Sequence, residues 1–408
     1  MVSTDDVATA PHQTTGDAHD RAAGKTPQGW ELNLPENRQA GSCNEQRAAR
    51  VVMDRFHAVA IPSLTLTGRA PGVQHYAELV ILPMLLAALL IGLFLPFVAA
   101  VLVALILALY AAETAGEGLI ARVVPQTSTT SVLAAVPAQR QNVRTLILVA
   151  PLDTLRRGRV YPQIVAPLFS RLERAVFAAG LLAGGTPLLR AVAVTALPTW
   201  FFLLPAAVLL ALLLLVADRS SSTDADPTSN AEPQISTLMQ LATEVRAHPA
   251  RWVDIWGFVA GAGSISGVTL AALLRENNLA PESTFIVNLQ VSPTHTPTVA
   301  LAEGPLWKRR AAPTLTRHVA GSGAYVLRER LTETTLSAMP LAQQYQAVTL
   351  GLPLSTSTSD AGAIDAATQR LRAFVDAIDH DILERQRVTR LAQRVDHRSK
   401  RLTNPPRM

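Results

Sequence analysis

The run Val143-Arg-Thr-Leu-Ile-Leu-Val-Ala-Pro-Leu-Asp-Thr154 decides the fold of this chain. Its centre, residues 146–150, holds only aliphatic side chains and stops at Pro151. A short apolar run of this kind predicts a strand that is buried on both faces of an α/β sheet. Because ligands bind at the carboxyl edge of such sheets, we expect residues 151–154 to lie where a functional site would form.

Asp153 is the acidic side chain at that edge. Its simplest role is to cap a turn or the helix that follows the strand, since aspartate is a common N-cap. The other role is in a site at the sheet edge, and the local sequence leaves both open.

The composition indicates that part of the chain lies in a lipid bilayer. Hydrophobic residues make up 49% and charged residues 16% of the 408 residues, and the mean hydropathy of +0.23 is too high for an ordinary soluble protein. The single cysteine, Cys43, excludes an internal disulfide and fits a reducing compartment. The pI near 9.8 comes mainly from arginines spread over the chain, which favours an anionic membrane surface as a partner and not nucleic acid.

Two uncharged blocks are the candidates for membrane insertion. Residues 79–110 carry no charge and are interrupted by Gly92 and Pro96. One continuous helix of that length would span roughly 48 Å, against a hydrocarbon core of about 30 Å, so a hairpin is expected. The second block has two arms, residues 175–189 and 191–217, separated by Arg190. We therefore predict four transmembrane helices arranged as two hairpins.

The remaining segments alternate between strand-like and helix-like patterns. Strands are expected at residues 57–67, 131–136, 144–150, 252–260, 284–291 and 347–350, and helices at 45–56, 235–247, 265–274 and 364–383. Strands separated by helices predict a three-layer α/β/α domain with a mostly parallel mixed sheet.

The chain divides into seven expected segments. They are a disordered N-terminal tail (1–40), the start of the α/β domain (41–78), hairpin 1 (79–112), the first central strands (113–173), hairpin 2 (174–217), the remainder of the domain (218–384) and a basic C-terminal tail (385–408).

Six short segments carry a resemblance to a known family. In order they are Gly41-Ser before an Ala-Ala-Arg helix, Ser131-Val-Leu-Ala-Ala-Val-Pro, Leu146-Ile-Leu-Val-Ala-Pro-Leu-Asp-Thr, Phe258-Val-Ala-Gly-Ala-Gly-Ser, Asn288-Leu-Gln and Gly351-Leu-Pro. As an ordered set they resemble the co-catalytic di-zinc aminopeptidases of clan MH. That group includes bacterial aminopeptidases, glutaminyl cyclases and the transferrin-receptor ectodomain. The resemblance implies a zinc-aminopeptidase fold.

The resemblance also implies where the zinc site would lie. Family members bind two zinc ions through histidines and carboxylates, and a glutamate acts as general base. The corresponding positions here are Pro151 for the first histidine, Asp153 for the aspartate that orients it, about Asn230 for the bridging aspartate, Gly263 and Ser264 for the glutamate pair, and Gln290 for the next aspartate. No histidine occurs between Val319 and Asp379, where the last ligand is expected.

Proline, glycine and serine cannot replace the imidazole and carboxylate groups from which zinc sites are built. Gly263 has no side chain that could accept a proton from a metal-bound water. We therefore predict a pseudoenzyme without zinc, in which Asp153 survives as a structural carboxylate bound to backbone amides. The protein would serve as a non-catalytic binding or assembly module, with a protein or peptide partner in the former active-site cleft.

Two other interpretations stay open. The first is an active membrane-bound metallopeptidase or other hydrolase with rearranged site residues, which would bind zinc or use Ser264 or Ser266 with His295 as base. The second is an anion site in the glycine-rich stretch 261–267, between a strand and a helix.

The predicted sheet also fixes the membrane topology. The strands between and after the two apolar blocks share one sheet, and the helix before Phe56 packs on it. All three soluble pieces therefore lie on one side of the membrane, so each block must cross it an even number of times. Arginines flank the blocks on the domain side at positions 122, 140, 144, 156, 157, 159, 171 and 174, whereas the hairpin tips offer only Arg190. By the positive-inside rule we expect an integral membrane protein whose domain faces the cytoplasm.

Overall fold

A computed structural model provides the structure of the chain. It describes residues 32–140, 142–158, 171–192, 198–226, 229–292, 296–304, 306, 308–321, 326–328, 340–341, 343–353 and 361–403. The side chains of residues 386–403 are outside this description.

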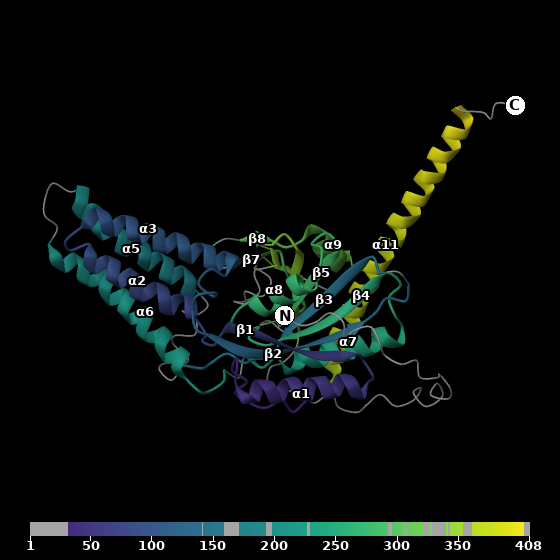
Figure 1. Cartoon of the computed structure of the whole chain (residues 1–408), viewed down its shortest axis with the longest axis horizontal. Helices are drawn as coiled ribbons and strands as arrows, with labels where there is room; N and C mark the ends of the chain where they lie inside the picture. Colours follow the sequence, from purple (N-terminus) through teal and green to yellow (C-terminus); the bar gives the residue numbers. More distant parts are fainter. Residues whose placement is uncertain are drawn as a thin grey trace.

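An eight-stranded mixed sheet organises the domain, in the order β1-β2-β4-β3-β5-β10-β6-β9 (Figure 1). Its strands are β1 Ser63–Pro71, β2 Gln126–Val136, β3 Arg144–Pro151, β4 Val253–Ala260, β5 Thr284–Val291, β6 Thr298–Ala300, β9 Val326–Arg328 and β10 Gln346–Leu352. The central strands β4, β3, β5 and β10 run parallel. The pairs β1–β2, β2–β4 and β10–β6 are antiparallel, so the sheet is less parallel than the sequence suggested.

The first apolar block explains one antiparallel pair. Helices α2 (Tyr76–Ile91) and α3 (Pro96–Ala112) lie between β1 and β2 along the chain. A helical hairpin returns the chain to its starting side, so β2 can lie directly beside β1 in the opposite direction. The two strands pair from Ser63 opposite Ala134 to Pro71 opposite Gln126.

The second apolar block interrupts the connection from β3 to its parallel neighbour β4. It forms α5 (Leu172–Val192) and α6 (Leu203–Ser221), and the chain then continues through α7 (Glu232–Ala247) into β4. The two hairpins form one four-helix bundle that projects from the domain (Figure 1). The strands between and after the blocks lie in one sheet, as predicted, and β1, the strand before the blocks, joins the same sheet at its edge.

The expectation of four full-length membrane helices is wrong for one of the four helices of the bundle. In the part of the chain that the structure describes, three helices are long and apolar enough to cross a membrane: Pro96–Glu117, Leu172–Val192 and Trp200–Ser221. The fourth, α2, has 16 residues, or roughly 24 Å against a hydrocarbon core of about 30 Å. It is short because the chain turns at Gly92 before Pro96 opens α3. The end of α3 continues as a π-helical turn, η2 (Glu113–Glu117).

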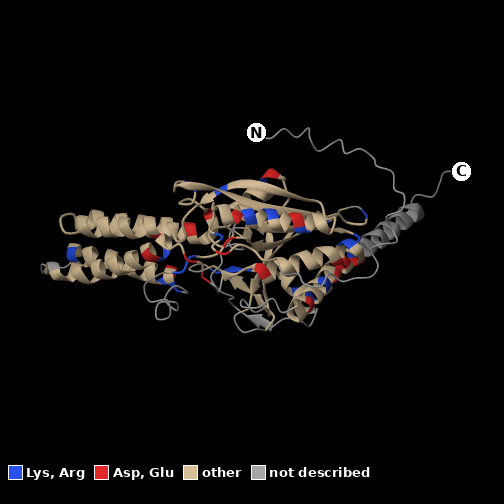
Figure 2. Cartoon of the chain, turned by 90° about the horizontal axis from the view of Figure 1, so that it is seen from below, with Lys and Arg blue, Asp and Glu red and all other residues tan. Residues whose placement is uncertain are grey.

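Small residues allow α5 to approach α3 closely. A Cβ atom at Gly180 would lie 2.5 Å from Leu107 Cδ2, and one at Gly184 would lie 2.8 Å from Val103 Cγ1. This Gly-x-x-x-Gly spacing is typical of packed membrane helices. Large apolar side chains face outward from the bundle, among them Phe94, Phe97, Leu105, Leu189, Trp200 and Leu214. The bundle helices are almost uncharged along their length (Figure 2).

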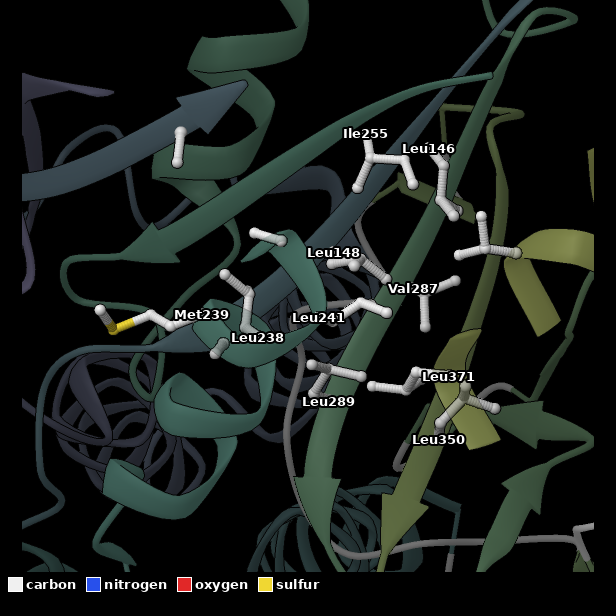
Figure 3. Packing of buried hydrophobic residues seen from close by; sticks show 14 of the residues in the cluster. Leu146, Leu148, Leu238, Met239, Leu241, Ile255, Val287, Leu289, Leu350 and Leu371 are labelled. Atoms are coloured by element: carbon white, nitrogen blue, oxygen red, sulfur yellow. The ribbon is translucent and has the colours of Figure 1, made fainter. Parts of the chain in front are cut away.

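The domain has the expected three layers. Leu146 and Leu148 of β3 point into the main core, which is covered by α1 (Cys43–Ala58), α7, α9 (Pro313–Gly321) and α11 (Ala361–Thr403). Figure 3 shows the leucines of α7 packed against those of β3, β5 and β10. Ile147 and Val149 point to the other face, where α8 (Val268–Glu276) covers them.

Several expected boundaries shift. Helix α1 continues to Ala58, so the strand expected at residues 57–67 begins only at Ser63. Leu32 and Leu34, placed by the sequence in a disordered tail, are buried in the main core; residues 1–31 lie outside the description. Helix α11 continues to Thr403 and so includes most of the expected basic tail.

Candidate functional site at the carboxyl edge of the sheet

The edge predicted from the sequence forms where β3 and β4 end side by side. Pro151, the last residue of β3, pairs with Ala260, the last residue of β4. The stretch 261–267 then turns back over the strand end. A Cβ atom at Gly263 would lie 3.2 Å from Pro151 Cα, so two of the predicted site positions are neighbours.

Asp153 is joined to Ser264 at this edge. Its Oδ1 accepts a hydrogen bond of 2.9 Å from the Ser264 backbone N–H, and its carbonyl oxygen accepts one of 3.2 Å from Ser264 Oγ. The carboxyl is fully buried. The expected contact between Asp153 and a backbone amide is therefore confirmed. The second oxygen, Oδ2, is buried and has no hydrogen-bond partner within the described part of the chain.

Arg38 completes the edge, although no sequence pattern pointed to it. Its Nε donates to the Leu152 carbonyl at 2.9 Å, and its two terminal nitrogens donate to the Pro35 carbonyl at 2.8 Å and to Asn230 Oδ1 at 3.0 Å. The residue is only 3% exposed. Asn230 is thus held by an arginine that lies in the expected tail, and no local pattern marks that arginine as buried.

Glu45, in the first turn of α1, forms hydrogen bonds with the same edge of the sheet. Ser42 and Glu45 have capping-box spacing, and Ser42 Oγ accepts a hydrogen bond of 3.1 Å from the Glu45 N–H. The Glu45 carboxylate accepts from the N–H groups of Gly41 at 2.8 Å and Ala262 at 3.0 Å, and from the Thr129 hydroxyl at 2.6 Å. The contact of Glu45 with the Ala262 N–H joins residues 217 positions apart, which no local sequence pattern indicates.

Gln290 lies on the strand that neighbours β3 on the side opposite β4. It is on β5, paired in register with Gly351 of β10. It is 7% exposed, and its Oε1 is buried without a hydrogen-bond partner among the residues described. The structure therefore brings together Pro151, Asp153, Asn230, Gly263 and Ser264. Gln290 lies on the adjacent strand β5, two residues beyond the pair of Val149 with Asn288.

The buried carboxyls have unusual proton affinity. The pKa of Asp153 is raised from 3.8 to about 7. Burial is the main cause and the nearby Glu45 adds to it, whereas the Ser264 N–H and Arg38 act in the opposite direction. Burial also raises the pKa of Glu45, against the effect of its hydrogen bonds. For Arg38, burial lowers the pKa, and Glu232 and Asp153 partly restore it.

The residues at this edge do not fit a zinc ion. Of the six positions, only Asp153 carries a side chain that ligates zinc well, and one of its oxygens already accepts the Ser264 N–H. The positive charge that acts on the Asp153 carboxyl is that of Arg38, which lowers its pKa. Among the described residues, no three His, Cys, Asp or Glu side chains are grouped so that they could hold a metal.

The two other interpretations find little support in the geometry. Ser264 Oγ donates to the Asp153 carbonyl, and His295, the expected base, lies outside the described residues. In the stretch 261–267, the N–H groups of Gly261, Ala262 and Ser264 already donate to Ser131, Glu45 and Asp153. Amides that are used within the protein are not available to hold an anion.

Comparisons with solved structures return glutaminyl cyclases and zinc aminopeptidases. A glutaminyl cyclase from Fimbriiglobus ruber has 10% identity over 84% of this chain and 90% of that chain, with a TM-score of 0.44. A zinc aminopeptidase from Bacillus subtilis has 8% identity over 84% and 90%, with a TM-score of 0.43. A leucine aminopeptidase precursor from Bacteroides thetaiotaomicron has 7% identity over 84% and 92%, with a TM-score of 0.44. No family model matches the sequence, and no curated protein matches it.

The raised pKa of Asp153 predicts a distinct pH dependence of stability. Because the folded state holds the proton more tightly than the unfolded state, this group stabilises the fold below pH 3.8, and the stability is lost as pH rises to about 7. The difference corresponds to about 4 kcal/mol at most. Asp153→Asn should remove this dependence, so the variant should gain stability relative to the unmodified protein as pH rises from 4 to 8.

Urea unfolding of the detergent-solubilised full chain, followed between pH 4 and 8, measures this effect. Asp54→Asn, at an exposed position of α1, is the matched control and should leave the profile unchanged. If the free energy of unfolding changes with pH in the same way for Asp153→Asn and the unmodified protein, the prediction is wrong. Ionisation of the Asp153 carboxyl would then not destabilise the folded state.

Proposed function

We propose that this protein is a membrane-anchored, non-catalytic domain with a zinc-aminopeptidase-like fold that serves as a binding or assembly module. The observation that carries the proposal is the network of Arg38, Asp153 and Glu45 at the carboxyl edge of the sheet. Arg38 donates to Asn230 Oδ1, and Asp153 accepts from the Ser264 N–H. The family resemblance implies metal ligands at Asn230 and Ser264, and at Asp153 the aspartate that orients the first histidine.

The network supports a structural role for the edge. Each of the three charged side chains is at most 3% exposed, and each joins segments that are far apart in the sequence. Side chains that are enclosed and hydrogen-bonded in this way fix backbone positions. Of the carboxylate oxygens of Asp153 and Glu45, only Asp153 Oδ2 has no hydrogen-bond partner among the described residues, and it is buried.

A partner would bind at the same edge of the sheet, beside Gln290. The buried Oε1 of Gln290 is an acceptor with no hydrogen-bond partner in the described chain, and an unsatisfied buried acceptor is stabilised by a donor that reaches it. We infer a protein or peptide partner, because its backbone N–H groups supply such donors.

The membrane part of the proposal is supported by the bundle surface. Outward-facing side chains include Phe94 at 84%, Phe97 at 68% and Trp200 at 62% exposure. Exposed apolar side chains over a whole helical bundle are unfavourable in water and stable in lipid. Both hairpins begin and end at the domain, so the domain lies on one side of the bilayer, and the flanking arginines favour the cytoplasmic side.

Zinc content and peptidase activity provide the first test. We expect the purified full-length protein to contain no stoichiometric zinc by elemental analysis and to leave aminoacyl-nitroanilides uncleaved, with or without added zinc. The same assays on a zinc aminopeptidase purified in the same detergent provide the positive control. Stoichiometric zinc together with cleavage would favour the alternative of an active peptidase with rearranged ligands.

Membrane topology is the second test. Reporter fusions after Arg140, in the loop between β2 and β3, and after Thr403, at the end of α11, should both report the cytoplasm. A fusion at Gly92, in the turn between α2 and α3, should report the opposite side. Reporters after Arg140 and Thr403 on different sides would contradict the paired crossings.

A further inference from the structure

A groove lies on the face of the domain that α8 covers. Its volume is about 1150 Å³. Its lining includes one side of α8, the second half of the edge strand β1, and the segment that follows η2; Ser128 of β2, residues 278–281 and residues 343–345 complete it. The first and third of these are far apart in the sequence, so the groove exists only in the folded domain.

Positive charge dominates the lining. Arg69 of β1, Arg122 after η2, and Arg275 of α8 all line the groove and are all exposed. The acidic lining residues are Glu117 and Glu276, and Glu117 is paired with Arg309, outside the groove, at 3.8 Å. Among the residues that the structure describes, none of the three lining arginines forms a salt bridge.

The groove also lies next to the expected membrane surface. η2 directly continues the membrane helix α3, and the segment after it carries Arg122. Two apolar side chains flank this arginine, Leu119 at 41% and Val123 at 84% exposure. β1, which forms another wall, leads directly into α2. Apolar side chains beside arginines at the end of a membrane helix suit the interface between lipid tails and headgroups.

We propose that this groove binds the phosphate-bearing headgroup of an anionic phospholipid in the leaflet on the domain side. The proposal rests on the membrane insertion inferred above. Guanidinium groups bind phosphate oxygens through paired, charge-assisted hydrogen bonds. Arg122 holds the headgroup from the membrane side, while Arg69 and Arg275 hold it from the domain. Leu119 and Val123 lie against the first part of the acyl chains.

Lipid binding by the full-length protein in a non-ionic detergent tests the proposal. Short-chain phosphatidylglycerol and phosphatidylcholine are titrated in parallel, and binding is followed by native mass spectrometry. We expect a clear preference for phosphatidylglycerol. Arg69→Gln combined with Arg275→Gln should weaken phosphatidylglycerol binding roughly tenfold, since each arginine near an anionic surface contributes measurably to affinity. Binding of phosphatidylcholine should stay the same.

The matched control removes two exposed arginines from α1, on the opposite face of the sheet, by Arg47→Gln and Arg50→Gln. This control lowers the net charge equally and should keep the lipid preference. Equal loss in both double variants, or no loss in either, would overturn the groove as the binding site. Glycerol 3-phosphate serves as the soluble probe: if it binds as tightly as the lipid, the ligand is a soluble phosphate and the lipid assignment is wrong.

A separate measurement distinguishes failure of the proposal from failure of the membrane anchoring on which it rests. Alkaline carbonate should leave the unmodified protein and both double variants in the membrane fraction. Extraction of the unmodified protein would overturn the anchoring itself. Retention without any preference for phosphatidylglycerol would overturn the groove alone.

Discussion

Arg38→Ala should destabilise the domain by about 3 kcal/mol, because it removes a buried charge together with its hydrogen bonds. The substitution leaves the Leu152 carbonyl and Asn230 Oδ1 without the donor that now binds each of them. It also removes the cation that lowers the pKa of Asp153. The loss should be measurable by urea unfolding of the detergent-solubilised full chain, followed by tryptophan fluorescence.

The pH profile separates this role from a simple packing defect. Without the guanidinium, the pKa of Asp153 should rise further, so the pH range over which stability falls should extend upward. Arg47→Ala, on the exposed side of α1, is the control and should change stability by less than about 0.5 kcal/mol. If both variants lose a similar amount of stability, the hydrogen bonds of Arg38 to Leu152 and Asn230 do not hold these segments together specifically.

Gly261→Ala should have a comparable effect, about 3 kcal/mol or more, for a steric reason. A Cβ atom at this position would lie 2.4 Å from the Thr130 carbonyl oxygen and 2.4 Å from Thr129 Oγ1. Real contacts of this kind are not this short, and backbone cannot move aside as a flexible side chain can. The substitution would push the end of β4 away from β2 and disturb the hydrogen bond from Thr129 to Glu45.

Gly68→Ala is the matched control, because the new Cβ atom would lie no closer than 3.6 Å, against Thr269 Cγ2. It should change the free energy of unfolding by less than about 0.5 kcal/mol. Unfolding of both variants in urea gives the comparison. Equal stability of the two variants would mean that the β2–β4 edge can relax, and that the stretch 261–267 is not tightly held.

The strand around Leu146 shows how well local patterns work here. A dense apolar run has few alternatives to burial, and β3 is found at Arg144–Pro151 as predicted. The same reasoning located β4, β5 and β10 and the three long apolar helices. The predicted boundary differs from the structure where a helix and a strand follow each other directly: α1 ends at Ala58 and β1 begins at Ser63, whereas the strand was expected from residue 57.

The site was only partly visible for a different reason. Asp153 follows a recognisable strand, so its place at the sheet edge could be predicted. Arg38 could not, because its acceptors at Leu152 and Asn230 are 114 and 192 residues away in the sequence. The reach of Glu45 to the Ala262 N–H spans 217 residues. No periodicity over a short window carries information about such contacts.

The sequence by itself determined that the chain has two apolar blocks and an α/β domain, and that Asp153 follows a buried strand. Each of these depends on local composition and spacing, which set helix and strand formation directly. Only the tertiary structure decided that β1 and β2 pair antiparallel around a helical hairpin, that α2 is shorter than a full membrane crossing, and that Arg38 lies buried beside Asp153. These features arise from packing between distant segments, where the cost of burying a charge is offset only by partners that folding brings together.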